Sequence, residues 1–192
     1  HILFNMLVFY WFAKLFVEYL GSDRLIALYV IGGLSGGILY LLLFNTIPFF
    51  IERQSILVGS SASVYAVVVA TATLLPNYTF FLIFLGPVRI KYIAAVYVVI
   101  SFLSSTGSNA GGEIAHLGGA IIGFLYTKQL QAGIDLGSWV TAVITWVKNL
   151  FRPRPRVKVS YRKKEPSYTY ARPAKGTTAE NVKVSQEEID AI

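Results

Sequence analysis

The sequence predicts an all-α membrane protein: a polytopic bundle of transmembrane helices followed by a polar tail. Hydrophobic residues make up 55% of the chain and charged residues only 14%, and the mean hydropathy is +0.58. These values lie outside the range of soluble globular proteins. The positive charge is concentrated at one end. From Lys148 onward there are 11 Lys/Arg and 5 Asp/Glu, so this part carries +6 of the net charge of +7.

Five apolar segments have the composition of membrane spans, which need about 20 residues each. Between the third and fourth segments, Thr79–Leu85 is apolar but too short to cross a bilayer, so we expect a re-entrant or interfacial piece. Asn45–Ser55, between the second and third, is expected to be a loop. The five segments form a predicted membrane domain, residues 1–130. They are His1 to about Val17, Leu25–Phe44, about Ile56–Leu75, a fourth that includes Tyr92–Leu103, and about Glu113–Leu130.

The segment after the membrane domain, residues 131–151, has a different pattern. Trp139, Val143, Trp146 and Leu150 recur at helical spacing, and a run of Arg and Pro follows them. Aromatic and basic flanks are typical of an amphipathic helix at a membrane interface. A short soluble helix that packs on the tail is the alternative. Residues 152–192 are basic and show no apolar period, which predicts a disordered cytoplasmic tail.

The charges in the short loops predict the orientation, because cytoplasmic loops carry an excess of Lys and Arg. Basic residues follow the first, third and fifth spans, whereas the opposite loops contain only Arg53. The first set is therefore expected in the cytoplasm together with the tail, and His1 is expected on the outer side. The basic residues of the cytoplasmic set outside the tail are Lys14, Arg24, Arg89, Lys91 and Lys128.

This orientation puts several polar side chains at a similar depth in the outer leaflet. His1 and Asn5 lie at the outer end of the first span. Ser61 is expected about five residues into the third span, and His116 about three residues into the fifth. Polar residues inside a membrane are costly and usually functional. A serine needs a base within hydrogen-bond reach to become a nucleophile, and histidine is the natural base.

The same residues suggest how such a site would be built. His1 and Asn5 are four residues apart and share a helix face, so they can donate to an oxyanion together with the Ser61 amide. Tyr65 lies one turn after Ser61, where it can stack on His116. The only nearby acid, Glu113, is expected at the interface, which favours a Ser/His dyad over a triad. No group of side chains suggests a metal site, and the chain has no cysteine.

Small residues flank both polar positions. Gly119 and Gly123 form a Gly-x-x-x-Gly face just after His116, and Gly59 lies two residues before Ser61. Such faces allow close helix contact in membranes, although they are often only packing. Serine in a membrane helix commonly bonds its own backbone. The functional interpretation therefore depends on the whole set at matched depth, not on one residue. Ser60 and Ser63 are competing nucleophiles by residue type.

Three separated motifs resemble the rhomboid intramembrane serine proteases. They are the His-x-x-x-Asn pattern at His1 and Asn5, the Gly-x-Ser pattern at Ser61, and the segment around His116 with Gly119 and Gly123. The resemblance covers about residues 1–130 and implies five of the family's six core helices. It implies that Ser61 is the nucleophile, that His116 is the general base, and that Tyr65 packs on the histidine. His1, Asn5 and the Ser61 amide would form the oxyanion hole. Ala62 departs from the glycine that is common after the nucleophile.

The sequence therefore predicts a multi-pass membrane endopeptidase that cleaves transmembrane proteins near the outer face. Its expected partners are these substrates and the lipid bilayer, with no nucleic acid and no cofactor. The expected membrane is the bacterial inner (plasma) membrane. One alternative is a catalytically silent rhomboid-like protein that binds membrane helices. A transporter with an intramembrane histidine is less favoured, because membrane acids and inverted repeats are not evident.

Overall fold

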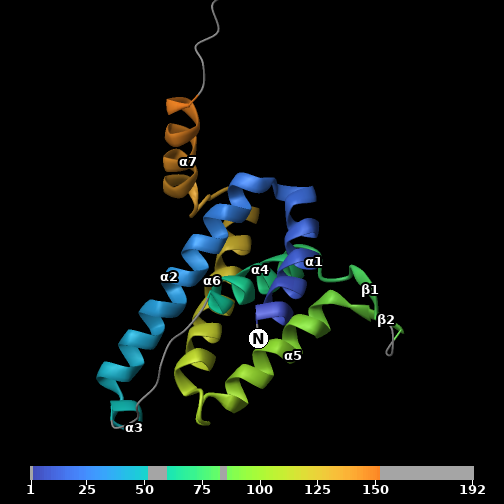
Figure 1. Ribbon diagram of the computed structural model, residues 1–192. Coiled ribbons are helices and arrows are strands. Elements are labelled where there is room, and N and C mark those ends of the chain that lie inside the picture. Colours follow the sequence, from blue (N-terminus) through green and yellow to red (C-terminus); the bar gives the residue numbers. More distant parts are fainter. Residues whose placement is uncertain (1, 52–59, 83–85, 152–192) are drawn as a thin grey trace, which may run out of the picture. The chain divides into compact units, whose positions relative to one another are not determined.

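The computed structural model describes residues 2–51, 60–82 and 86–151, all of which belong to one compact unit. Its described helices are α1 (Ile2–Leu20), α2 (Ser22–Thr46), α3 (Pro48–Ile51), α4 (Ser61–Leu74), α5 (Ile90–Ser104), α6 (Ala110–Gln131) and α7 (Ser138–Leu150). The strands β1 (Thr79–Leu82) and β2 (Gly86–Arg89) lie between α4 and α5. Figure 1 shows the helices as a bundle with the two strands to one side. The expected all-α class is confirmed, because helices form almost all of the described unit.

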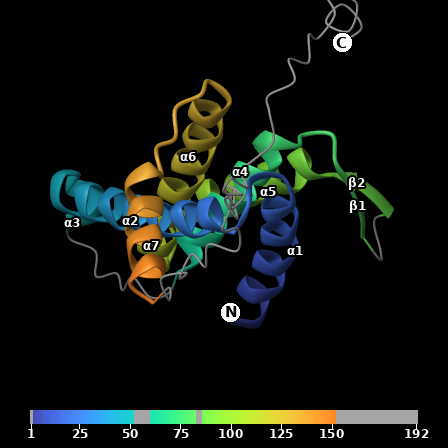
Figure 2. The ribbon, with the colours of Figure 1, turned by 90° about the horizontal axis from the view of Figure 1, so that it is seen from above.

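Helix α4 is the centre of the bundle. It packs against α1, α2, α5 and α6, and the view from above also places it among these helices (Figure 2). Ten of its 14 residues are buried, on every side of the helix. A helix that is buried all round belongs to a core, so the hydroxyls and methyl groups of α4 face other helices.

The outer faces of the surrounding helices are apolar. Large side chains are exposed along α1, α2 and α5, including Phe4, Ile38, Leu41 and Phe102. Large exposed apolar surfaces mark contact with a protein partner, a ligand or a membrane. Two of the described helices, α1 and α2, are long and apolar enough to cross a membrane, whereas α4 and α5 are apolar but shorter. The structure thus supports a membrane protein, with fewer full-length spans than the five that we expected.

Several boundaries differ from the sequence expectations. Helix α2 continues to Thr46, and the short α3 occupies part of the expected loop Asn45–Ser55. Helix α6 begins at Ala110 instead of Glu113. The described part of the third span begins only at Ser61. Residues 56–59 of that expected span lie outside the described residues, as do His1, Gly59 and the tail from residue 152.

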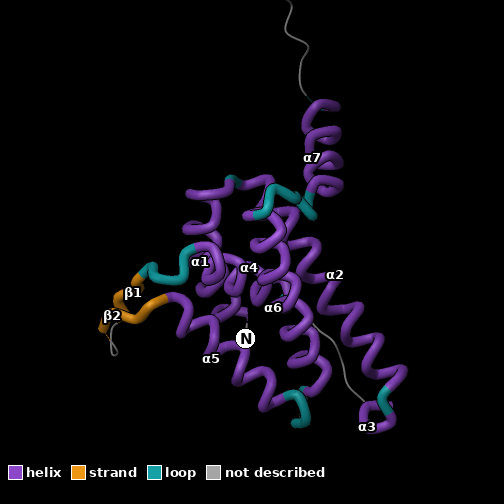
Figure 3. Tube along the Cα trace, turned by 180° about the vertical axis from the view of Figure 1, so that it is seen from behind, coloured by secondary structure: helices purple, strands orange, loops and turns teal. Residues whose placement is uncertain are grey.

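The apolar segment after α4, expected as a re-entrant or interfacial piece, includes a strand. Thr79–Leu82 pairs antiparallel with Gly86–Arg89, and Figure 3 shows both strands at the start of α5. Exposure alternates along β1, as it does in a strand with one face covered. The covered face includes Phe80, whose ring lies 5.5 Å from that of Phe12 in α1. A short apolar run does not distinguish a strand from a helix by period alone, so the sequence did not predict the strand.

Helix α7 joins the bundle at the end where α1 turns into α2. That turn needs glycine at Gly21, whose φ of 83° is rare for other residues. Lys148 of α7 forms an ion pair with Asp23 just after the turn. In the loop before α7, Asp135 accepts a hydrogen bond from the Gly137 amide at 2.8 Å and contacts Arg24 at 3.4 Å. These contacts connect α7 to α2, while most of its apolar side chains remain exposed.

Candidate active site

The site is formed where the start of α4 meets the first third of α6. Ser61 is the first residue of α4, and His116 is the seventh residue of α6. The Oγ atom of Ser61 lies 2.8 Å from Nε2 of His116, and both residues are only 7% exposed. This is the hydrogen-bond distance that we expected for the pair. Their positions along the helices differ from the expected depths, because α4 begins at Ser61 and α6 begins before Glu113.

Glycines allow the two helices to approach this closely. A Cβ atom on Gly119 would lie 2.0 Å from the carbonyl oxygen of Ala62, and one on Gly123 would lie 2.3 Å from that of Ala66. Atoms cannot approach so closely, so only glycine fits at both positions. The helices therefore meet along the Gly-x-x-x-Gly face, as expected. The contact at Ala62 fixes the residue that follows Ser61.

Tyr65 fixes the plane of the histidine ring. Its own ring stacks on that of His116, with centroids 4.1 Å apart and an interplanar angle of 6°. Tyr65 lies one turn after Ser61 on α4, so one helix face presents both the hydroxyl and the stacking ring. The expected stacking is thus present in the structure.

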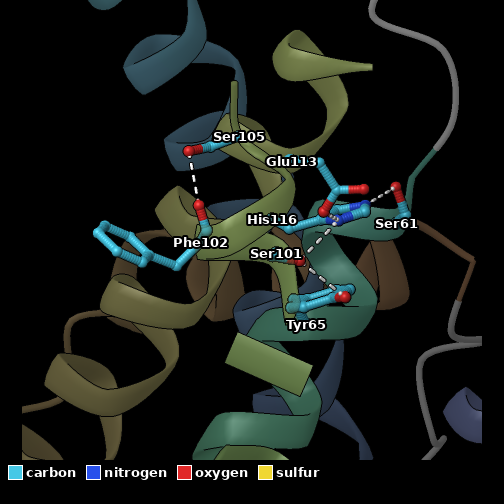
Figure 4. A network of polar contacts seen from close by, with 7 residues as sticks. All are labelled: Ser61, Tyr65, Ser101, Phe102, Ser105, Glu113 and His116. Atoms are coloured by element: carbon cyan, nitrogen blue, oxygen red, sulfur yellow. Dashed lines mark hydrogen bonds and ion pairs between the residues drawn. The ribbon is translucent and has the colours of Figure 1, made fainter. Parts of the chain in front are cut away.

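Two further oxygens face the other ring nitrogen of His116. Nδ1 lies 3.2 Å from Oε2 of Glu113 and 3.3 Å from Oγ of Ser101. Ser101 in α5 is fully buried and donates a hydrogen bond of 2.9 Å to the Tyr65 hydroxyl. Figure 4 shows these side chains converging on the ring from three helices, with Ser61 on its opposite edge.

The expectation for Glu113 must be corrected. We expected it at the interface and therefore favoured a dyad, yet its carboxylate contacts the ring of His116. The spacing contained the signal, because residues three apart on a helix lie on the same face. Ser101 was missed altogether. A hydroxyl within the apolar fourth span was the available sign, but its partner could not be deduced without knowing how α5 rotates against α6.

The expected oxyanion donors are Asn5, His1 and the Ser61 amide. Asn5 lies half-buried on α1, which packs on α4. Among the described residues, the structure records no hydrogen bond from Asn5 to Ser61 or His116. His1 and Gly59 lie outside the described residues, so their expected roles stay predictions.

The competing serines point elsewhere. Ser63 is buried, and a Cβ atom on Gly33 of α2 would lie 2.7 Å from its Oγ. Its hydroxyl therefore faces α2. Ser60 precedes α4 and is exposed. Of these three serines, the structure records a hydrogen bond to His116 only for Ser61.

Comparison with known proteins identifies the family of this chain. No curated protein and no solved structure matches the chain. The family model of the Rhomboid domain matches residues 1–132, which include every helix that contributes to the site. This match covers well over half of the sequence, and the protein is therefore a member of the rhomboid family.

Proposed function

We propose that this protein is an intramembrane serine endopeptidase that cuts transmembrane proteins. The rhomboid family consists mostly of such proteases, although members without activity exist. The observation that carries the proposal is the 2.8 Å contact between Ser61 Oγ and His116 Nε2. A buried hydroxyl that donates to a ring held in place by stacking has the arrangement of an activated nucleophile.

The chemistry follows from these two side chains. Nε2 of His116 takes the Ser61 proton as Oγ attacks the carbonyl carbon of the scissile peptide bond. The carbonyl oxygen becomes an oxyanion, for which Asn5, His1 and the Ser61 amide are the proposed donors. When the tetrahedral intermediate collapses, the imidazolium gives its proton to the leaving amine. Water then attacks the acyl-enzyme by the same route and releases the second product.

The substrates are proposed to be membrane proteins, cut near the outer face. The apolar exterior of the surrounding helices supports a route by which a transmembrane segment reaches the site from the bilayer. The distribution of Lys and Arg supports an orientation with the tail in the cytoplasm. That this membrane is the bacterial inner membrane stays a prediction.

Labelling with a fluorophosphonate, which reacts with activated serines, tests the proposal directly. We expect the purified protein in detergent to be labelled, and Ser61→Ala and His116→Ala to abolish both labelling and cleavage of a reconstituted transmembrane substrate. Ser63→Ala is the matched control, because its hydroxyl faces α2, and it should be labelled like the wild type. A folded wild-type protein that binds such a substrate but is neither labelled nor able to cut would be a silent binder, and the proposal would be wrong.

A further inference from the structure

The second ring nitrogen of His116, Nδ1, contacts residues other than Ser61, and these contacts extend the proposed site. A neutral imidazole carries one hydrogen, on either nitrogen. Nε2 accepts the Ser61 proton only if its lone pair is free, so the hydrogen must be on Nδ1. This form of the ring is favoured when an acceptor faces Nδ1.

Two acceptors face Nδ1, and both fit this form of the ring. The Glu113 carboxylate at 3.2 Å has no hydrogen to donate when it is ionised. The Ser101 hydroxyl at 3.3 Å donates its own hydrogen to Tyr65, which leaves its lone pairs for the ring. The network therefore has a consistent direction, from Ser101 to Tyr65 and from His116 to the two acceptors.

The two acceptors differ in what they do after proton transfer. Once Nε2 has taken the Ser61 proton, the ring is positively charged, and a carboxylate stabilises that charge far more than a hydroxyl does. Glu113 lies in the first turn of α6, where the helix dipole favours a negative charge. Its side chain is 18% exposed, against 9% for the ring, so the carboxylate is at the more open side of the pair.

We propose that Glu113 is a positioning residue that completes a Ser61–His116–Glu113 triad, in place of the dyad that the sequence favoured. Its carboxylate holds the hydrogen on Nδ1 and stabilises the imidazolium. Ser101 is a second, weaker acceptor. This inference rests on the proposed protease function, because only proton transfer from Ser61 gives the imidazolium a role.

Glu113→Gln tests the charge at nearly constant shape. A general base typically contributes about 10²–10⁴ in rate, and because Ser101 still accepts from Nδ1, we expect a loss of about 10² in kcat and in the labelling rate. KM and the melting temperature should not change. Glu113→Asp keeps the carboxylate and should recover part of the rate. Ser101→Ala should lose less than Glu113→Gln.

Asp135→Asn is the matched control, because it removes a carboxylate at the opposite end of α6. Asp135 accepts from the Gly137 amide and from the Tyr126 hydroxyl, so its loss should lower the melting temperature and leave the labelling rate of the folded protein unchanged. A Glu113→Gln variant labelled at the wild-type rate would overturn the proposal. So would a Ser101→Ala variant that is slower than Glu113→Gln, because Ser101 would then be the principal acceptor.

Nuclear magnetic resonance of the histidine rings separates this inference from the protease function. The chain has two histidines, and His116→Ala identifies the signals of the second. A charge-assisted bond to Glu113 should place the Nδ1 proton at low field in the wild type, and Glu113→Gln should move it upfield. An unmoved proton would refute the triad whatever the activity. A wild type that shows this shift but is never labelled would refute the protease function and leave the contact between Glu113 and the ring established.

Discussion

Two serines of α4 show how strongly the role of a residue depends on the direction in which its side chain points. Ser61 and Ser63 are both buried hydroxyls, two residues apart on one helix. A separation of two residues rotates a side chain by about 200°. Ser61 therefore reaches the ring of His116, whereas Ser63 faces α2 near Gly33. The sequence around the two serines is nearly the same. The direction in which each side chain points within the bundle decides which hydroxyl contacts His116.

The proposed role of Asn5 as an oxyanion donor leads to a prediction about rate. Loss of one such donor costs about 10²–10³ in kcat in soluble proteases. Because the Ser61 amide would remain as a donor, we expect Asn5→Ala to slow cleavage by about 10² at most, with labelling still detectable and an unchanged melting temperature. Turnover is measured on a reconstituted transmembrane substrate. Unchanged turnover with a lower melting temperature would show instead that Asn5 only holds helices together.

Much of the site could be predicted from the sequence, because it depends on the spacing of residues within single helices. Ser61 and Tyr65 share a face because they are four residues apart, and the two segments with Ser61 and His116 carry glycines that imply close contact. Neither Ser101 nor the contact of Glu113 could be deduced in the same way. Both depend on how far α5 and α6 are rotated and shifted against each other, which is set by packing between helices and not by any local period.

At the scale of elements, the contact between α4 and α6 sets the distance from Ser61 to His116. It is made by glycines against backbone carbonyls, so it has little room to adjust. The same limit does not apply to every glycine in the bundle. A Cβ atom on Gly37 of α2 would meet nothing within 4 Å, which makes that residue a natural control.

Gly119→Ala is therefore expected to destabilise the protein and to slow labelling together. The added methyl group would lie 2.0 Å from the Ala62 carbonyl oxygen, so α4 must shift, at a cost of about 1–3 kcal/mol. This shift displaces Ser61 from His116. Gly37→Ala should leave labelling unchanged and raise stability by up to about 1 kcal/mol, through helix propensity. Melting curves and labelling rates of the two variants provide the check, and equal behaviour would contradict this account.

Helix α7 leads to a second prediction at this scale. Val140 is buried, but Trp139 is 54% exposed and Trp146 is 67% exposed. An aromatic face that does not pack against the protein fits a membrane interface. In a Trp11→Phe background, brominated lipids should quench the fluorescence of these two tryptophans. If they are quenched only by a water-soluble reagent, α7 is a soluble helix, as the alternative interpretation holds.

At the scale of the whole molecule, the proposed side of cleavage depends on how the protein is oriented in the membrane. The hairpin formed by β1 and β2 ends next to Arg89 and Lys91, at the opposite end of α5 from the loop before α6. The excess of basic residues on that side predicts that the hairpin, the turn at Gly21 and α7 all face the cytoplasm. Ser61, the first residue of α4, would then lie toward the outer side. The hydropathy pattern predicted the apolar helices of the bundle but not the hairpin, because its strands are too short to give a distinct period.

The orientation can be tested by single cysteine substitutions, because the chain has no cysteine. In intact cells, a membrane-impermeant thiol reagent should label a cysteine at Asn109 and should not label one at Lys91. Permeabilised cells provide the control, since both positions should then react. The reverse pattern would place Ser61 toward the cytoplasmic side and would overturn the proposed side of cleavage.

The central position of α4 also bears on how the protein is made. Its neighbours α1 and α2 precede it in the chain, whereas α5 and α6 follow it. While the chain is being synthesised, Ser61 therefore enters the membrane before its base exists, and α4 finds its last neighbour only when α6 has been inserted. The proposed protease would therefore have no proton acceptor for Ser61 until the bundle is complete. Unfinished chains would pass through the insertion machinery without the ability to cut the proteins around them.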